Sequence, residues 1–138
     1  MNVTIKQKDI EEMAVYAKSK LPEEVCGLIA GTWEGEQKYI EKVYYLTNTD
    51  HSREHFSMDP KEQLAAVKDM RAKGLTPLGN WHSHPETPAR PSQEDIRLAY
   101  DKQASYLILS LMEESHPVLH SFHVVSECAF QDDLRVIK

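Results

Sequence analysis

Residues 80–95 read Asn80-Trp81-His82-Ser83-His84-Pro85-Glu86-Thr87-Pro88-Ala89-Arg90-Pro91-Ser92-Gln93-Glu94-Asp95, in the pattern H-x-H-P-x6-S-x-x-D. The residues that lead into this pattern predict a strand over 76–84. Three prolines then stiffen a loop, because a proline ring fixes φ and removes a hydrogen-bond donor. Ser92 is a preferred N-cap residue and predicts a helix that runs to about Lys102. The stretch therefore predicts a strand, a rigid loop and a helix in direct succession.

Two histidines of this stretch have the spacing of metal ligands. Residues two apart on a strand project from the same face, so His82 and His84 can offer two imidazole nitrogens to one ion. A catalytic zinc takes three protein ligands and keeps a fourth position for water, and Asp95 in the first turn of the helix is the candidate for the third ligand. A capping box would also explain Ser92 and Asp95 without any metal, and the two interpretations are compatible.

The remaining sequence alternates helical and strand patterns. The predicted elements are a helix over residues 5–20, strands over 25–31 and 38–47 joined as a hairpin by the turn 34–36, a helix from Asp59-Pro60 to Gly74, and strands over 106–111, 118–125 and 127–137. Residues 48–54 are polar and predict a loop. Periodicity by itself indicates a mixed α and β class and nothing finer.

Length and composition limit the function classes. The chain has 138 residues, the usual size of one domain, so we expect a single domain over residues 1–138. A net charge of −6 provides no basic field for nucleic acid. No apolar run approaches the roughly 20 residues of a membrane span, and the N-terminus lacks the apolar run of a signal peptide, so we expect a cytoplasmic protein that binds no membrane.

Other residues with reactive or coordinating side chains receive structural interpretations. Cys26 and Cys128 lie among apolar residues of predicted strands and are expected to be buried, reduced thiols. The pair His51 and His55 falls in a polar loop, where a substrate contact stays open. The pair of histidines at positions 120 and 123 would face opposite sides of a strand, so no metal role is assigned to either pair. Trp81 is expected to be a packing residue.

The pattern from His82 to Asp95 resembles the signature of the JAMM, or MPN-plus, metalloproteases. That family also carries a catalytic glutamate on a P-x-E-x-C-G-like segment, and Pro22-Glu23-Glu24-Val25-Cys26-Gly27 is similar to it. The resemblance spans essentially the whole chain and is closest to the minimal stand-alone prokaryotic type. It implies an α/β (α+β) fold with a curved, mixed, largely antiparallel sheet flanked by helices, a cytidine-deaminase-like architecture.

The resemblance also implies the roles of five residues. His82, His84 and Asp95 would bind Zn²⁺, with a water molecule in the open position. Glu24 would be the general base that later protonates the leaving amine, and Ser92 would assist the oxyanion. The neighbouring Glu23 competes for the role of base, but adjacent residues of an extended segment face opposite sides, and the family spacing favours Glu24.

The substrate class follows from the same resemblance. It implies hydrolysis of the peptide or isopeptide bond after the C-terminal Gly-Gly of a ubiquitin-like sulfur-carrier protein, which releases cysteine, homocysteine or a short extension, or exposes Gly-Gly. The short connection after the third predicted helix argues against polyubiquitin. A metal-binding MPN scaffold without turnover and a hydrolase of small amides are the alternatives. The sequence also leaves a homodimer open.

Overall fold

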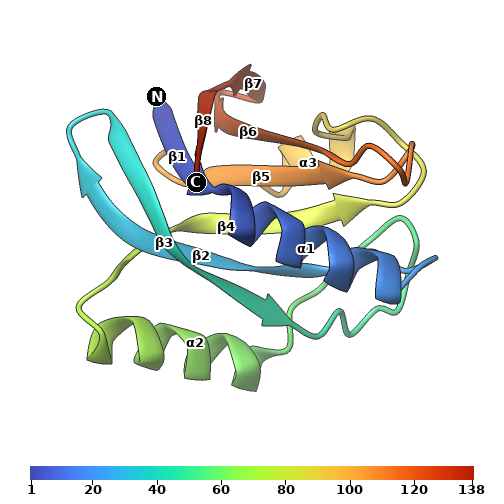
Figure 1. Ribbon diagram of the computed structural model, residues 1–138, viewed down its shortest axis with the longest axis horizontal. Helices are drawn as coiled ribbons and strands as arrows, with labels where there is room; N and C mark the ends of the chain where they lie inside the picture. Colours follow the sequence, from blue (N-terminus) through green and yellow to red (C-terminus); the bar gives the residue numbers. More distant parts are fainter.

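A single eight-stranded sheet organises the computed structural model, which describes residues 1–138 (Figure 1). The elements along the chain are β1 (Asn2–Lys6), α1 (Gln7–Ser19), β2 (Cys26–Glu34), β3 (Gln37–Leu46), α2 (Pro60–Ala72), β4 (Thr76–His84), α3 (Gln93–Arg97), β5 (Ser105–Ser110), β6 (Val118–Val125), β7 (Cys128–Gln131) and β8 (Asp133–Ile137). The strand order is β7-β6-β5-β4-β2-β3-β1-β8. Four of the seven strand pairings are antiparallel and three are parallel, which agrees with the expected mixed, largely antiparallel sheet.

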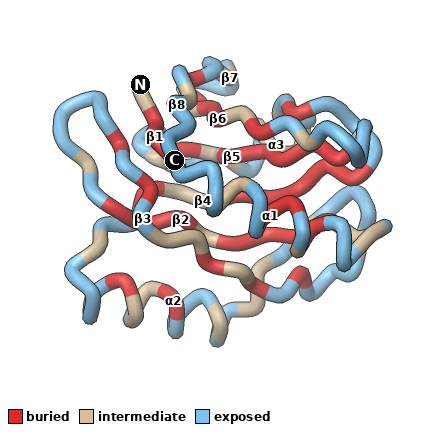
Figure 2. The backbone as a smooth tube through the Cα atoms, viewed as in Figure 1, coloured by how far each residue is buried: buried red, intermediate tan, exposed pale blue.

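The two long helices cover opposite faces of this sheet. Ile29 of β2 belongs to the larger apolar cluster, which contains Met13 and Ala17 of α1. The next residue, Ala30, belongs to a separate cluster with Met70 of α2. Because adjacent residues of a strand face opposite sides, α1 and α2 pack on different faces. Figure 2 shows the resulting pattern, with buried residues along the central strands and exposed residues on the outer sides of both helices.

The sheet is curved so strongly that its two ends meet. The strands β7 and β8 occupy opposite ends of the strand order, yet only Asp132 separates them in the chain. The buried Asp132 carboxylate accepts a hydrogen bond from the Ser121 hydroxyl at 2.8 Å and pairs with His123 at 2.7 Å. Register shifts in β2 on both sides of Ala30 add local twist, as β-bulges do. This closure brings the last strand beside the first.

The N-terminus differs from the sequence-based expectation. The predicted helix over residues 5–20 begins two residues later, and the segment before it is the strand β1. All three central residues of β1 are buried, since Val3, Thr4 and Ile5 lie between β3 and β8. Tertiary pairing with strands distant in sequence creates this element, and a five-residue window carries little signal for it.

Three further expectations were wrong in detail. The helix that follows Ser92 ends at Arg97 and does not reach Lys102. The single strand predicted over 127–137 is divided into β7 and β8, because Asp132 turns the chain from one end of the sheet to the other. Cys26 is a buried free thiol as expected, but Cys128 is exposed because β7 is an edge strand. None of the helices has the length and apolar character needed to cross a membrane.

Candidate metal centre and catalytic cleft

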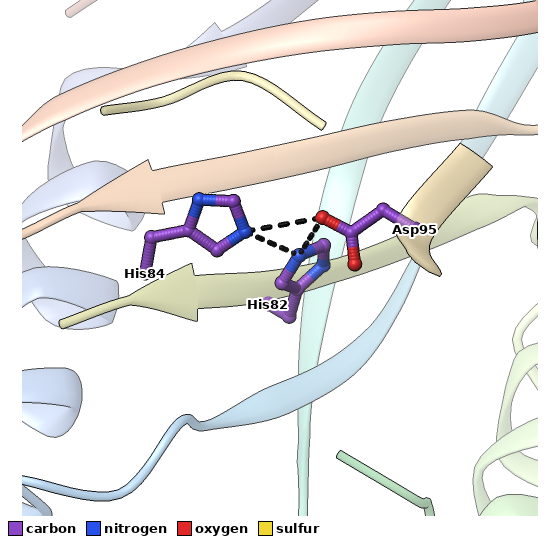
Figure 3. Close-up of side chains that lie close together, drawn as sticks. All are labelled: His82, His84 and Asp95. Atoms are coloured by element: carbon purple, nitrogen blue, oxygen red, sulfur yellow. Dashed lines mark hydrogen bonds and ion pairs between the residues drawn. The ribbon is translucent and has the colours of Figure 1, made fainter. Parts of the chain in front are cut away.

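Three polar side chains converge where β4 ends and α3 begins. The Nε2 atoms of His82 and His84 lie 3.1 Å apart, and each lies 3.1 Å from Oδ2 of Asp95 (Figure 3). The two imidazoles are nearly inaccessible, whereas the Asp95 side chain is 18% exposed. The trio is therefore buried on one side and open toward solvent on the other.

The local structure orients the two imidazole rings. His82 and His84 are two residues apart on β4 and so share a face, as the sequence predicts. Nδ1 of His84 donates to the Pro88 carbonyl at 2.9 Å, which leaves a lone pair on Nε2 of the neutral ring. His82 stacks on Phe56 with ring centroids 4.7 Å apart, and its own Nδ1 is buried without a hydrogen-bond partner. One ring is thus oriented by a hydrogen bond and the other by an aromatic contact.

The capping interpretation of the third residue also holds. The Ser92 hydroxyl accepts from the Asp95 N–H at 3.0 Å, and Asp95 Oδ2 accepts from the Ser92 N–H at 2.9 Å. The same carboxylate oxygen faces both imidazoles. The capping box therefore fixes the carboxylate in the position that the histidines require.

The trio fits a zinc ion in its chemistry and dimensions. Imidazole nitrogen and carboxylate oxygen are zinc ligands with bonds of about 2.0–2.2 Å, so a tetrahedral site separates its ligand atoms by roughly 3.4 Å. Burial acts to raise the pKa of Asp95, but its close side-chain contacts with the two histidines outweigh this effect and hold the pKa well below its usual range. Asp95 is therefore an ionised oxygen donor at neutral pH, and these three residues could hold one metal ion.

Glu24 lies beside this trio. In the antiparallel register of β2 and β4, Cys26 pairs with His82, which places Glu24 level with His84. Its side chain lines a cleft of about 330 Å³ together with His84 and Ser92, although the residue is only 5% exposed. Burial raises the pKa of Glu24 to about 8, an effect that His84 opposes and Asp95 reinforces. The competing Glu23 pairs instead with His51 at 3.0 Å.

The polar loop for which the sequence left a substrate contact open forms the other wall of the cleft. The cleft-lining residues of this loop, between β3 and α2, are Arg53, Glu54 and His55. The His55 imidazole pairs with Glu94 of α3 at 2.8 Å, and both residues line the cleft. Asn48 ties the loop together, since its side-chain amide donates to the carbonyls of Glu24 and His55 at 3.0 and 2.9 Å. No local motif in the sequence marks these long-range contacts.

The other predicted structural residues behave as expected. Trp81 is fully buried, and its indole N–H donates to the Tyr44 carbonyl at 3.0 Å. His120 contacts the Ala89 carbonyl at 3.1 Å, and His123 pairs with Asp132. Neither histidine joins the trio at the end of β4.

Comparison with known proteins places this geometry in a family. Residues 6–124 match the model for prokaryotic homologs of the JAB domain. A CysO-cysteine peptidase from Mycobacterium tuberculosis is 29% identical over 129 residues, which cover 94% of this chain and 87% of the relative. A probable TtuB-protein conjugate cleaving protease from Thermus thermophilus is 36% identical over 91 residues, or 65% of this chain and 58% of the relative.

A solved structure is similar over the full length. The solution structure of protein DSY2949 from Desulfitobacterium hafniense has 49% identity and a TM-score of 0.90, and the match covers 100% of this chain and 94% of that one. The family match extends from the end of β1 almost to the end of β6 and includes every residue of the trio, the cleft and the loop. The chain therefore belongs to the prokaryotic homologs of the JAB domain, which confirms the expected relationship to the JAMM metallopeptidases.

Proposed function

We propose that this chain is a zinc-dependent peptidase that hydrolyses the bond after the C-terminal glycine of a ubiquitin-like sulfur-carrier protein. The observation that carries the proposal is the convergence of His82, His84 and Asp95 beside a cleft that contains Glu24 and Ser92. The similarity to a CysO-cysteine peptidase over nearly the whole chain supports the substrate class. The released group would be an amino acid such as cysteine or a short extension.

The proposed metal ligands are the two histidine Nε2 atoms and Oδ2 of Asp95, whose separations of 3.1 Å suit one zinc ion. When bound, zinc would acidify a water molecule and polarise the scissile carbonyl as a Lewis acid. Of these three residues, His84 also lines the cleft, and its side chain is only 6% exposed.

Glu24 would move the proton. Its carboxylate would accept a proton as water adds to the glycine carbonyl carbon, and it would then deliver that proton to the amine as the C–N bond breaks. The immediate products are the carrier with a free glycine carboxylic acid and a neutral amine. The acid proton then passes to the amine, which gives a carboxylate and an ammonium at neutral pH, so atoms and charge balance. The raised pKa of Glu24 supports this role, because a carboxyl that titrates near neutral pH can accept and donate in one cycle.

Ser92 would stabilise the developing negative charge on the carbonyl oxygen. Its oxygen already accepts a hydrogen bond from the Asp95 N–H, so the hydroxyl hydrogen is available to donate into the cleft. A donor placed there would stabilise the tetrahedral oxygen more than the planar carbonyl. We place the whole reaction in one domain over residues 1–138 and in the cytoplasm. All five site residues come from one chain, so the proposal requires no second copy, and a homodimer would leave it unchanged.

Intact-mass spectrometry tests the proposal. Ubiquitin-like sulfur carriers extended beyond Gly-Gly are incubated with zinc-loaded wild type or with Glu24→Gln, and we expect loss of the extension with the wild type alone. Absence of cleavage with one bound zinc would favour the metal-binding scaffold. Cleavage of small amides without any carrier cleavage would favour the small-amide hydrolase. Either result would reject the proposed substrate.

A further inference from the structure

We infer that Arg53 binds the α-carboxylate of the released residue, so that the cleft selects carriers extended by one amino acid with a free C-terminus. The inference rests on the proposed function and adds the chemical identity of the leaving group. It assigns a specificity-determining role to a loop residue that the motif does not contain.

The position of Arg53 is tied to the proposed base by main-chain hydrogen bonds. The Glu24 N–H donates to the Ser52 carbonyl at 2.8 Å, and Arg53 is the next residue. The Ser52 hydroxyl accepts from the N–H groups of Glu54 and His55 at 3.0 and 3.2 Å, which folds the loop into a turn around Arg53. A leaving amine that takes its proton from Glu24 therefore emerges next to Arg53. In an amino acid, the carboxylate is separated from that amine by a single carbon.

The charges of the cleft make Arg53 distinctive. Four of the residues that line the cleft are acidic, namely Glu24, Glu54, Glu86 and Glu94. Arg53 is the only lysine or arginine among the lining residues. An unpartnered carboxylate would be repelled by such a wall. A guanidinium offers a planar fork of donors that matches a carboxylate in a bidentate arrangement. Arg53 is therefore the one permanently cationic side chain of the cleft wall with which an anionic group can pair.

Arg53 is also available to a ligand. Its partner in the structure is Glu86, at 3.5 Å, and the two side chains are 57% and 68% exposed. An ion pair so exposed contributes little stability and exchanges readily. By contrast, His55 and Glu94 approach to 2.8 Å across the same cleft. Glu86 thus holds the guanidinium at the rim, and a substrate carboxylate can displace it.

The size of the cleft agrees with a small leaving group. Its volume of about 330 Å³ lies at the lower end of the roughly 300–1,000 Å³ found for small-molecule sites. A lysine side chain in an isopeptide bond presents no carboxylate near the cleaved nitrogen, and a C-terminal amide presents no charge. Arg53 should therefore not increase the rate of cleavage of either substrate.

The test compares two carriers that differ only at the terminus, one ending in Gly-Gly-Cys with a free carboxylate and one ending in Gly-Gly-Cys-amide. Zinc-loaded wild type should cleave the acid with a kcat/KM on the order of 10- to 100-fold higher than that for the amide, the range of a charge-assisted hydrogen bond. Arg53→Gln should reduce this ratio to near one by lowering the value for the acid alone. Arg53→Lys should retain part of the preference. The matched control is Arg90→Gln, because Arg90 is exposed but lies outside the cleft wall, and it should preserve the ratio.

The outcomes separate the two levels of inference. Unchanged cleavage of the amide by Arg53→Gln shows that the variant is folded and loaded with zinc. Equal cleavage of acid and amide by the wild type, or an equal loss on both carriers in Arg53→Gln, would overturn the role of Arg53 and leave the proposed peptidase intact. Cleavage of neither carrier by the wild type would reject the proposed function and this inference with it.

Discussion

Replacing Glu24 with glutamine removes a charge and a proton acceptor while keeping nearly the same volume. Glu24 contributes none of the three converging ligand atoms, so the variant should bind one zinc ion as the wild type does. Loss of a general acid–base group lowers turnover by about 10²–10⁴-fold, and we expect that loss in kcat on a sulfur-carrier substrate. Zinc content and cleavage measured on the same preparation separate a missing base from a missing metal.

The same variant changes the pH dependence of stability in the metal-free protein. Burial raises the pKa of Glu24 from 4.5 to about 8, so between these values the carboxyl is ionised in the unfolded chain and still protonated in the folded one. Folding then takes up a proton, and the free energy of unfolding falls as pH rises through this window. The span of about 3.5 units corresponds to at most about 5 kcal/mol. Glu24→Gln lacks this dependence, whereas Asp95 and His84 titrate in both proteins.

Urea unfolding of both chelator-treated proteins at pH 5 and pH 8 measures this effect. Between pH 5 and pH 8, we expect the free energy of unfolding of the wild type to fall by several kcal/mol more than that of Glu24→Gln. If the difference in free energy of unfolding between wild type and Glu24→Gln does not change with pH, burial does not raise the pKa of Glu24, and the structural argument is refuted. Retained turnover in the variant would move the role of base to Glu23. The control variant is Glu23→Gln, which removes an exposed pair with His51 and should keep full activity.

Three other substitutions test the scaffold and the ligands. His84→Ala should lose both stoichiometric zinc and turnover, and a variant that still binds one zinc by metal analysis would contradict the ligand assignment. Gly27→Ala should destabilise the protein by more than about 3 kcal/mol in urea unfolding, because the added Cβ would lie 1.7 Å from the Tyr44 carbonyl oxygen. In the control Gly35→Ala the added Cβ meets open space, and only backbone strain of about 1–2 kcal/mol is expected. Lys38→Ala should lower the free energy of unfolding by about 2–4 kcal/mol, since the fully buried ammonium donates to two main-chain carbonyls and a serine hydroxyl. A decrease below about 1 kcal/mol would show that water replaces the ammonium as donor to these groups.

The sequence predicts the elements that short-range patterns encode. The hairpin of β2 and β3, the helix α2 capped by Asp59 and the strand β4 all appear where periodicity and capping residues place them. The strand β1 and the division of β7 from β8 do not follow from local patterns, because each depends on a partner strand far away in sequence. The short helix α3 ends at Arg97, earlier than predicted, since no residue of this helix is buried against the sheet.

The candidate site divides in the same way. His82, His84 and Asp95 lie within fourteen consecutive residues, and their meeting follows from one strand, one rigid loop and one capping box. Only the family resemblance identifies Glu24, because the pairing of β2 with β4 that brings it to His84 is long-range. Arg53 and Asn48 escape prediction altogether. Their positions near Glu24 depend on hydrogen bonds of the Asn48 side chain and the Ser52 carbonyl with the main chain of Glu24, for which composition gives no signal.

Ser83 and Gly27 explain how two distant motifs act as one site. Ser83 stands between the two histidines, and its hydroxyl accepts from the Val25 N–H at 2.9 Å while its own N–H donates to the Val25 carbonyl at 2.9 Å. Val25 follows Glu24, so this pair of hydrogen bonds sets the proposed base level with the proposed metal ligands. Two residues further on, Gly27 leaves room for the indole of Trp81 to reach the Tyr44 carbonyl, which fixes the register of β4 from the other side. Ser83 and Gly27 therefore hold Glu24 and the histidines at a constant separation, which the proposed proton transfer between water, Glu24 and the leaving amine requires.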